Sequence, residues 1–125
     1  MTVFVLDTHV LLWWLTGQPL TPEATAAIID PSHDVYISVV TGWEIAIKSS
    51  QGKLAVDGDL TEDIYANGFD FLPIRWSHAS QAGALPNHHR DPFDRMLIAQ
   101  CQSEGFTLIS RDLNMTKYEV DLLVA

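Results

Sequence analysis

Two short apolar runs of this chain each end at an aspartate: Val3-Phe4-Val5-Leu6-Asp7 near its start, and Phe106-Thr107-Leu108-Ile109-Ser110-Arg111-Asp112 near its end. A short apolar run that stops at a carboxylate is typical of a strand buried on both faces of a parallel sheet. Parallel strands bring their carboxyl ends to one edge, where open α/β sheets bind their ligands. We therefore expect Asp7 and Asp112 to lie at one edge of a parallel sheet.

The length and composition indicate one globular domain, which we expect to span residues 1–125. Apolar residues make up 47% of the chain and charged residues 18%, which excludes a disordered protein. Cys101 is the only cysteine, so no intrachain disulfide can form, in agreement with a reducing compartment. No apolar run approaches the roughly 20 residues of a membrane helix, and the first residues do not resemble a signal peptide. We expect a soluble, cytoplasmic protein.

The formal net charge of −9 argues against a general nucleic-acid coat protein, because such proteins present basic faces. The basic residues are nevertheless unevenly placed. Four of the seven lie within four residues of Glu44, Asp94 or Asp112, namely Lys48, Arg90, Arg95 and Arg111. A local basic rim around an acidic centre is therefore compatible with the sequence.

Strand-like and helix-like segments alternate along the chain. Apolar, β-branched runs predict strands at 3–6, 35–38, 71–74, 106–110 and 120–124. Helical spacing and start and stop signals predict helices at 8–15, 22–29, 39–50, 60–66, 78–85 and 92–104. In the helix at 39–50 we expect Ile45 and Ile47 to face the core. This alternation predicts a three-layer α/β/α sandwich around a mostly parallel central sheet.

Three of the acids also have simpler structural interpretations. Asp7 would be the N-cap of the helix at 8–15, and Asp112 would be a turn residue. Glu44 would form an exposed ion pair with Lys48, four residues further on. These interpretations explain each acid alone, but not why two strands both end at one. From the residues alone, the structural and functional interpretations both stay open.

The motif Asp91-Pro92-Phe93-Asp94 contains two aspartates for which we predict different roles. Asp91 directly precedes a proline, which predicts an N-cap, and Asp94 then takes the third helical position. We expect Asp91 to be structural and Asp94 to be functional. If Asp94 met Asp7, Glu44 and Asp112 at one place, the four carboxylates would repel one another, and a divalent cation is the natural compensation.

Four blocks of the sequence together match a family: residues 7–13 (DTHVLLW), 38–48 (SVVTGWEIAIK), 89–100 (HRDPFDRMLIAQ) and 108–112 (LISRD). In this order and with these residues, the chain resembles the PIN-domain ribonucleases. It is most similar to the VapC-type toxins of bacterial toxin–antitoxin pairs. The resemblance covers essentially the whole chain and implies a PIN-like fold.

The resemblance implies a metal-dependent endoribonuclease that uses metal-activated water to cut RNA, leaving a 5′-phosphate and a 3′-hydroxyl. The acidic quartet of the family falls on Asp7, Glu44, Asp94 and Asp112. Asp7, Asp94 and Asp112 would bind Mg²⁺ or Mn²⁺, hard cations that suit carboxylate oxygens, and Glu44 would orient the water. Ser110 matches a position whose hydroxyl supports the metal site.

Further expectations concern contacts and partners. Three basic side chains would contact RNA phosphates or balance the acids: Lys48, Arg95 and Arg111. The resemblance implies a homodimer and a cognate VapB-type antitoxin. Trp13 and Trp14 cannot both face inward on one helix, so we expect one of them to add to an exposed apolar interface.

Other functions fit parts of this pattern. A catalytically weak PIN-fold module that binds RNA or regulates is the main alternative. A phospho-acceptor receiver domain also places aspartates at strand ends, but not a Glu44 and an Asp94 on helices. A metal-dependent phosphatase would use similar ligands. A zinc site is not expected, because the adjacent His88 and His89 cannot place both rings on one face of a helix.

Overall fold

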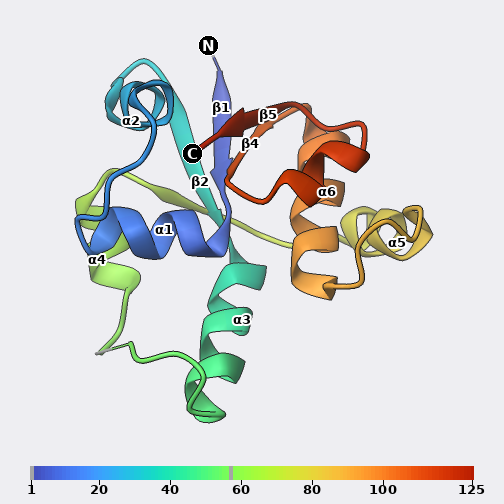
Figure 1. Cartoon of the computed structure of the whole chain (residues 1–125), viewed down its shortest axis with the longest axis horizontal. Coiled ribbons are helices and arrows are strands. Elements are labelled where there is room, and N and C mark those ends of the chain that lie inside the picture. Colours follow the sequence, from blue (N-terminus) through green and yellow to red (C-terminus); the bar gives the residue numbers. More distant parts are fainter. Residues whose placement is uncertain (1, 57) are drawn as a thin grey trace.

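The computed structural model describes residues 2–56 and 58–125, and these residues contain one sheet of five strands (Figure 1). The strands are β1 (Val3–Leu6), β2 (Asp34–Ser38), β3 (Asp70–Leu72), β4 (Thr107–Ser110) and β5 (Leu122–Val124). Their order across the sheet is β3-β2-β1-β4-β5, and every neighbouring pair is parallel. The predicted parallel sheet is confirmed.

The helices also lie close to their predicted positions. They are α1 (Thr8–Leu15), α2 (Pro22–Ile29), α3 (Val39–Ser50), α4 (Thr61–Ala66), α5 (Trp76–Ala84), α6 (Pro92–Glu104) and the 3-10 helix η1 (Leu113–Lys117). Helix α5 begins two residues earlier than predicted, because the Arg75 backbone N–H donates to His78 Nδ1 at 3.0 Å and closes its first turn. Within the described ranges, every helix is too short or too polar to cross a bilayer.

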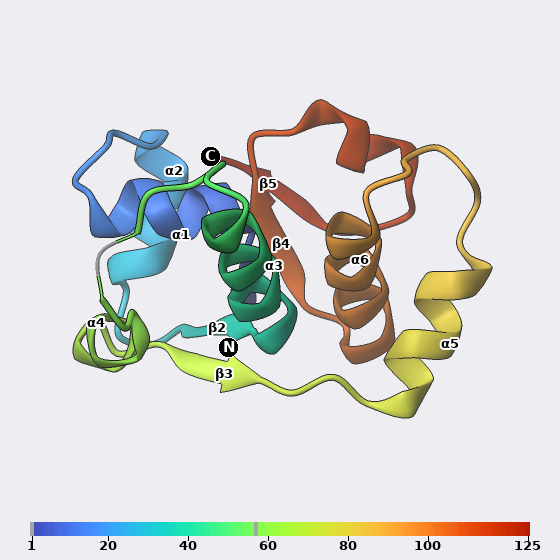
Figure 2. The same ribbon diagram turned by 90° about the horizontal axis from the view of Figure 1, so that it is seen from below.

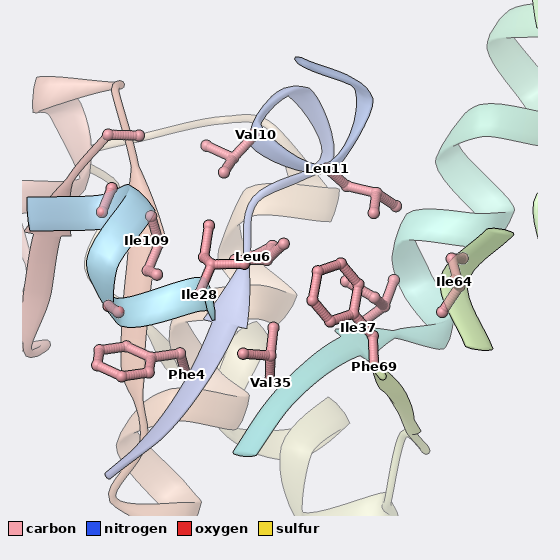
Figure 3. Packing of buried hydrophobic residues seen from close by; sticks show 13 residues of the cluster. Phe4, Leu6, Val10, Leu11, Ile28, Val35, Ile37, Ile64, Phe69 and Ile109 are labelled. Atoms are coloured by element: carbon pink, nitrogen blue, oxygen red, sulfur yellow. The ribbon is translucent and has the colours of Figure 1, made fainter. Parts of the chain in front are cut away.

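Side chains of the strands alternate between two apolar clusters, one on each face of the sheet. On one face, Phe4 and Leu6 of β1 pack with residues of α1, α2 and α4 (Figure 3). On the other face, Val5 packs with Leu97 and Ile98 of α6. Because consecutive residues of β1 enter opposite clusters, the sheet is the middle of three layers. This confirms the α/β/α sandwich.

The strand order creates a switch point between β1 and β4. The chain runs from β1 to β2 and β3 on one side and then crosses to β4 and β5 on the other. Ligands of open parallel sheets bind at such a point, outside the carboxyl ends of the strands. Asp7 directly follows β1, and its N–H donates to the Ile109 carbonyl of β4 at 3.0 Å. Seen from below, α3 lies between α1 and α6 at this end of the molecule (Figure 2).

Helix α3 does not bury the two isoleucines that we expected to face the core. Its buried residues are Val40, Thr41 and Glu44, whereas Ile45 and Ile47 are only half-buried. The expectation for the two isoleucines is therefore wrong. The helix turns polar side chains toward the switch point, and tertiary contacts there outweigh the local apolar pattern.

The expectation that Trp13 or Trp14 is exposed is also wrong. Both side chains are half-buried and pack against the apolar cluster that contains α1. Trp14 Nε1 donates to Asn67 Oδ1 at 3.0 Å, which satisfies the indole where it reaches the surface. The exposed tryptophans are instead Trp43, at 60%, and Trp76, at 88%.

Helix α6 begins and ends with the signals that the sequence predicted. Asp91 Oδ1 accepts hydrogen bonds from the Phe93 N–H at 2.9 Å and the Asp94 N–H at 3.3 Å. Gly105 ends the helix in a left-handed conformation with φ of 72°, which a side chain would strain. Asp91 is therefore the N-cap, and Asp94 stands in the first turn.

Replacing Asp91 tests this assignment through stability alone. Asp91→Ala should lower the free energy of unfolding by about 1 kcal/mol, because two N–H groups lose their acceptor. Asp91→Asn should change it by only a few tenths of that amount, since asparagine caps helices equally well. Urea unfolding measures both variants. Equal losses for the two would show that the cap is not what Asp91 contributes.

Candidate metal centre

Asp7 leaves β1 and turns into the interior. It takes the N-cap position of α1, where its carbonyl accepts from the Leu11 N–H at 3.0 Å, but its side chain makes no cap hydrogen bond, so capping does not explain the carboxylate. Its Oδ2 instead accepts a hydrogen bond from Ser110 Oγ at 2.6 Å. The residue is only 6% exposed, and burial raises the pKa of its carboxyl group, against the lowering effect of the Ser110 hydroxyl.

Ser110 connects the ends of the two central strands. Its buried hydroxyl donates to Asp7 and accepts a hydrogen bond from the Asp112 N–H at 3.1 Å. Asp112 has two roles, because its Oδ1 accepts from the Asn114 N–H at 2.9 Å and so caps η1. Its other oxygen, Oδ2, points toward the acidic centre. The turn interpretation of Asp112 is thus correct for one oxygen and leaves the second free for a ligand.

Glu44 is buried rather than exposed. Its Oε1 accepts a hydrogen bond from Thr8 Oγ1 at 2.6 Å, and Thr8 also contacts Thr41 Oγ1 at 3.2 Å. Its Oε2 pairs with Lys48 Nζ at 2.5 Å, and this hydrogen bond raises the pKa of the lysine. The side chain of Glu44 is 3% exposed and that of Lys48 is 32% exposed. The predicted pair exists, but it is anchored inside the site and not on the surface.

Asp94 lies where the other acids converge. Its pKa is raised to about 8, mainly by burial and then by the carboxylates of Asp7, Asp91, Glu44 and Asp112. Contacts join the acids of the quartet: His89 lies against Asp94 and Asp112, Ser110 links Asp112 to Asp7, and Glu44 binds Thr8, the residue after Asp7. The structure thus brings the four acids of the predicted quartet to the carboxyl end of the sheet.

His89 is the site residue that sequence reasoning missed. Its Nε2 is 2.8 Å from Asp94 Oδ2 and 3.4 Å from Asp112 Oδ2. The contact with Asp94 requires one proton between nitrogen and oxygen. The rings of His88 and His89 diverge, because His88 packs against Tyr118, with ring centres 5.2 Å apart. One feature of the sequence could have identified His89: it lies two residues before the N-cap of the helix that carries Asp94.

The two arginines near the acids donate mainly to backbone carbonyls. Arg95 donates to backbone carbonyls at the end of α5 and in the following loop, those of Ala82 at 2.8 Å, Leu85 at 2.9 Å and Pro86 at 3.0 Å. Arg111 donates to the carbonyls of Ala125 at 2.9 Å and Pro19 at 3.1 Å. Its guanidinium also lies 4.2 Å from the ring centre of Trp13. In the part of the chain that the structure describes, Glu44 is the one acid of the four that forms an ion pair with a lysine or arginine, and its partner is Lys48.

The donor atoms fit a hard divalent cation. Within residues 2–56 and 58–125, the donors of His89, Asp94 and Asp112 all lie within 4.8 Å of one another, with Asp7 linked to this group through Ser110. The donors are mainly carboxylate oxygens, which Mg²⁺ and Mn²⁺ prefer. Burial and then the neighbouring carboxylates raise the pKa of Asp94, and a bound cation would favour its charged form.

Comparison with known proteins agrees with this geometry. The PIN domain matches residues 4–120 of the chain. The chain belongs to the PIN domain family. This PIN domain is 25% identical to the ribonuclease VapC22 of Mycobacterium tuberculosis over 126 residues, which cover 94% of the chain and 93% of that protein.

Solved structures share the fold of this PIN domain. VapBC2 from Rickettsia felis, bound to a DNA fragment from its promoter, superimposes with a TM-score of 0.76 at 13% identity and covers 98% of both chains. VapBC-5 from Mycobacterium tuberculosis, a member of a family of toxin–antitoxin systems, has a TM-score of 0.61 at 20% identity, covering 99% of this chain and 98% of that one. The fold assignment therefore extends over the whole sandwich.

The crowding of acids around Asp94 predicts how stability depends on pH. A carboxyl group with a raised pKa in the folded state favours folding while protonated, so its contribution falls as the pH rises from about 4 to about 8. Asp94→Asn should therefore stabilise the metal-free protein at about pH 8, by on the order of 1 kcal/mol, and have little effect near pH 4. Thermal unfolding in EDTA measures the difference.

The matched control is Asp63→Asn, which removes one negative charge from an exposed position of α4. Its effect should be small and nearly independent of pH. If Asp94→Asn and Asp63→Asn showed the same pH profile, the carboxylates around Asp94 would not be strongly coupled.

Proposed function

We propose that this PIN domain is a Mg²⁺- or Mn²⁺-dependent endoribonuclease and the toxin of a toxin–antitoxin pair. The observation that carries the proposal is the convergence of Asp7, Glu44, Asp94 and Asp112 at the switch point between β1 and β4. Similarity to the ribonuclease VapC22 supports the substrate class. Solved toxin–antitoxin proteins of the same fold support the biological role. As a ribonuclease toxin, the protein would act on cellular RNA in the cytoplasm.

Three aspartates would hold the metal ion. Asp94 and Asp112 each present an oxygen to His89 Nε2, and Ser110 links Asp112 to Asp7. A bound divalent ion supplies positive charge that polarises the phosphodiester and makes water more acidic. The same charge would allow Asp94 to ionise at neutral pH, which its neighbours otherwise oppose.

Glu44 is suited to orient the attacking water. Thr8 and Lys48 each bind one of its carboxylate oxygens, which fixes the group and leaves lone pairs for a further donor. Water held by Glu44 would attack phosphorus while the P–O3′ bond breaks. One water proton passes to solvent, and the departing O3′ takes up a proton. The products are a 5′-phosphate and a 3′-hydroxyl, with no protein nucleophile.

Phosphate contacts would come from fewer cations than the sequence suggested. Lys48 is one-third exposed and keeps donors free beside Glu44. Arg111 lines a cavity of ≈ 250 Å³ together with Asp7 and Asp112, so it stands at the edge of the site. The guanidinium of Arg95 donates to backbone carbonyls, so Lys48 and Arg111 are the better candidates for phosphate contacts.

This chain also has an apolar cavity that could bind an antitoxin. A cavity of ≈ 440 Å³ lies beside α3 and is lined mainly by apolar side chains, among them Leu11, Ile45 and Phe71. Apolar concavities of this size are typical binding sites. We infer that a VapB-type antitoxin places apolar side chains there. The exposed Trp43 and Trp76, rather than Trp13 or Trp14, are the aromatic surface available for a homodimer.

Cleavage of RNA by the purified protein tests the proposal. It should require Mg²⁺ or Mn²⁺, stop in EDTA and resume when metal is restored. Asp94→Asn should lower the rate by about 10²–10³-fold or more, because it removes a charge that the metal-bound state needs. Asp91→Asn, the matched control on the same turn of α6, should stay within a few-fold of the wild type.

Three outcomes would contradict the proposal. Full cleavage by rigorously metal-free protein would exclude the metal. Loss of activity in Asp91→Asn with activity kept in Asp94→Asn would show that the two aspartates have exchanged roles. RNA binding with no cleavage in either metal would favour the regulatory PIN-fold module.

A further inference from the structure

The loop before α6 brings a nitrogen donor into the acidic centre. We propose that His89 is a ligand of the divalent ion, binding it through Nε2 together with Asp94 and Asp112. This inference rests on the metal site of the proposed function and adds to it a residue outside the four acids. It also predicts which of the two hard cations the site prefers.

The spacing of the three donor atoms is that of ligands on one ion. His89 Nε2 lies 2.8 Å from Asp94 Oδ2 and 3.4 Å from Asp112 Oδ2, and the three donors fall within 4.8 Å of one another. Ligand bonds of about 2.1 Å place adjacent donors of an octahedral ion about 3 Å apart and opposite donors about 4.2 Å apart. Small side-chain adjustments therefore suffice to seat one ion among the three.

The main chain around His89 is fastened in place. Its N–H donates to the Tyr118 hydroxyl at 2.9 Å, and that hydroxyl donates to the Pro86 carbonyl at 2.8 Å. Arg95 donates to the same Pro86 carbonyl at 3.0 Å and to the His89 carbonyl at 3.4 Å. Arg95 and Tyr118 are therefore positioning residues for the loop. A ring held in this way loses little entropy on binding a metal.

The neighbouring histidines do not share this arrangement. His88 is exposed and its ring packs against Tyr118. His9 is exposed on α1, and its ring lies against Trp13, with ring centres 5.9 Å apart. The ring of His89, by contrast, is 19% exposed, and its Nε2 lies against two carboxylates. His88 is therefore a suitable control, and His9, which lines a cavity with Asp7 and Asp112, is the competing nitrogen donor.

An imidazole ligand has a consequence for metal choice. Mg²⁺ prefers oxygen donors, whereas first-row transition metals also bind imidazole well. A site with one nitrogen and several carboxylate oxygens should therefore bind Mn²⁺ more tightly than Mg²⁺. Removal of the nitrogen should reduce this preference, because it weakens Mn²⁺ binding more than Mg²⁺ binding.

Pulsed electron paramagnetic resonance of the full chain loaded with Mn²⁺ tests the proposal without an activity assay. The electron spin of Mn²⁺ couples to a directly bound imidazole nitrogen, so the wild type should show a ¹⁴N modulation. His89→Gln should abolish it, whereas His88→Gln and His9→Gln should retain it. Calorimetry should show Mn²⁺ binding weaker by at least the roughly 10–100-fold that follows loss of a partner of a metal ligand, because His89→Gln removes a direct ligand.

The outcomes separate this inference from the proposed function. Bound Mn²⁺ with no nitrogen modulation in the wild type would overturn the role of His89 and leave the carboxylate site standing. Modulation that disappears in His9→Gln and persists in His89→Gln would overturn it equally. A wild-type protein that binds no Mn²⁺ would refute both. Circular dichroism of each variant confirms that it is folded, and comparison of the His89→Gln and His9→Gln spectra assigns the nitrogen to one residue.

Discussion

Repulsion among carboxylates is the constraint on which the rest of this structure depends. Asp7, Glu44, Asp94 and Asp112 come from four separate segments, and the fold gathers them at the carboxyl end of the sheet. Each acid is fixed by a different partner: Ser110 binds Asp7, Thr8 and Lys48 bind Glu44, and His89 contacts Asp94 and Asp112. These contacts position the oxygens but do not supply enough positive charge to neutralise them. The unmet charge is what a divalent ion would satisfy.

The use of basic residues sharpens this interpretation. The chain has only seven lysines and arginines against sixteen acids, so few basic side chains can neutralise the acidic centre. Arg95 and Arg111 lie close to the acids in sequence, yet both donate mainly to backbone carbonyls. Arg95 contacts the loop before α6, and Arg111 contacts the residue after β5 and the loop between α1 and α2. The two arginines thus position the backbone around the site, and a bound divalent ion would neutralise the charge of the carboxylates.

Much of the fold was predictable because local signals agreed with one another. Strands that end at Asp7 and near Asp112, and a proline after Asp91, each have a physical meaning that tertiary contacts did not override. The inward direction of the Glu44 side chain was not predictable from local residues. Thr8, which binds it, lies 36 residues away, and the neighbouring Ile45 is the more apolar candidate for the buried face. The role of His89 depended on how the loop before α6 folds. The contacts of Arg95 and Arg111 were not predictable, because the side-chain pattern does not show which backbone carbonyls will accept from them.

The most direct test of this account is a ¹³C NMR titration of the Asp94 carboxyl group. In the metal-free protein its midpoint should lie at about pH 8, because burial and the neighbouring carboxylates oppose ionisation. Saturating Mg²⁺ should lower that midpoint by several pH units, since the cation favours the charged form. A midpoint near the ordinary value of about 4 without metal, unchanged when Mg²⁺ is added, would contradict the claim that the four acids share one metal site.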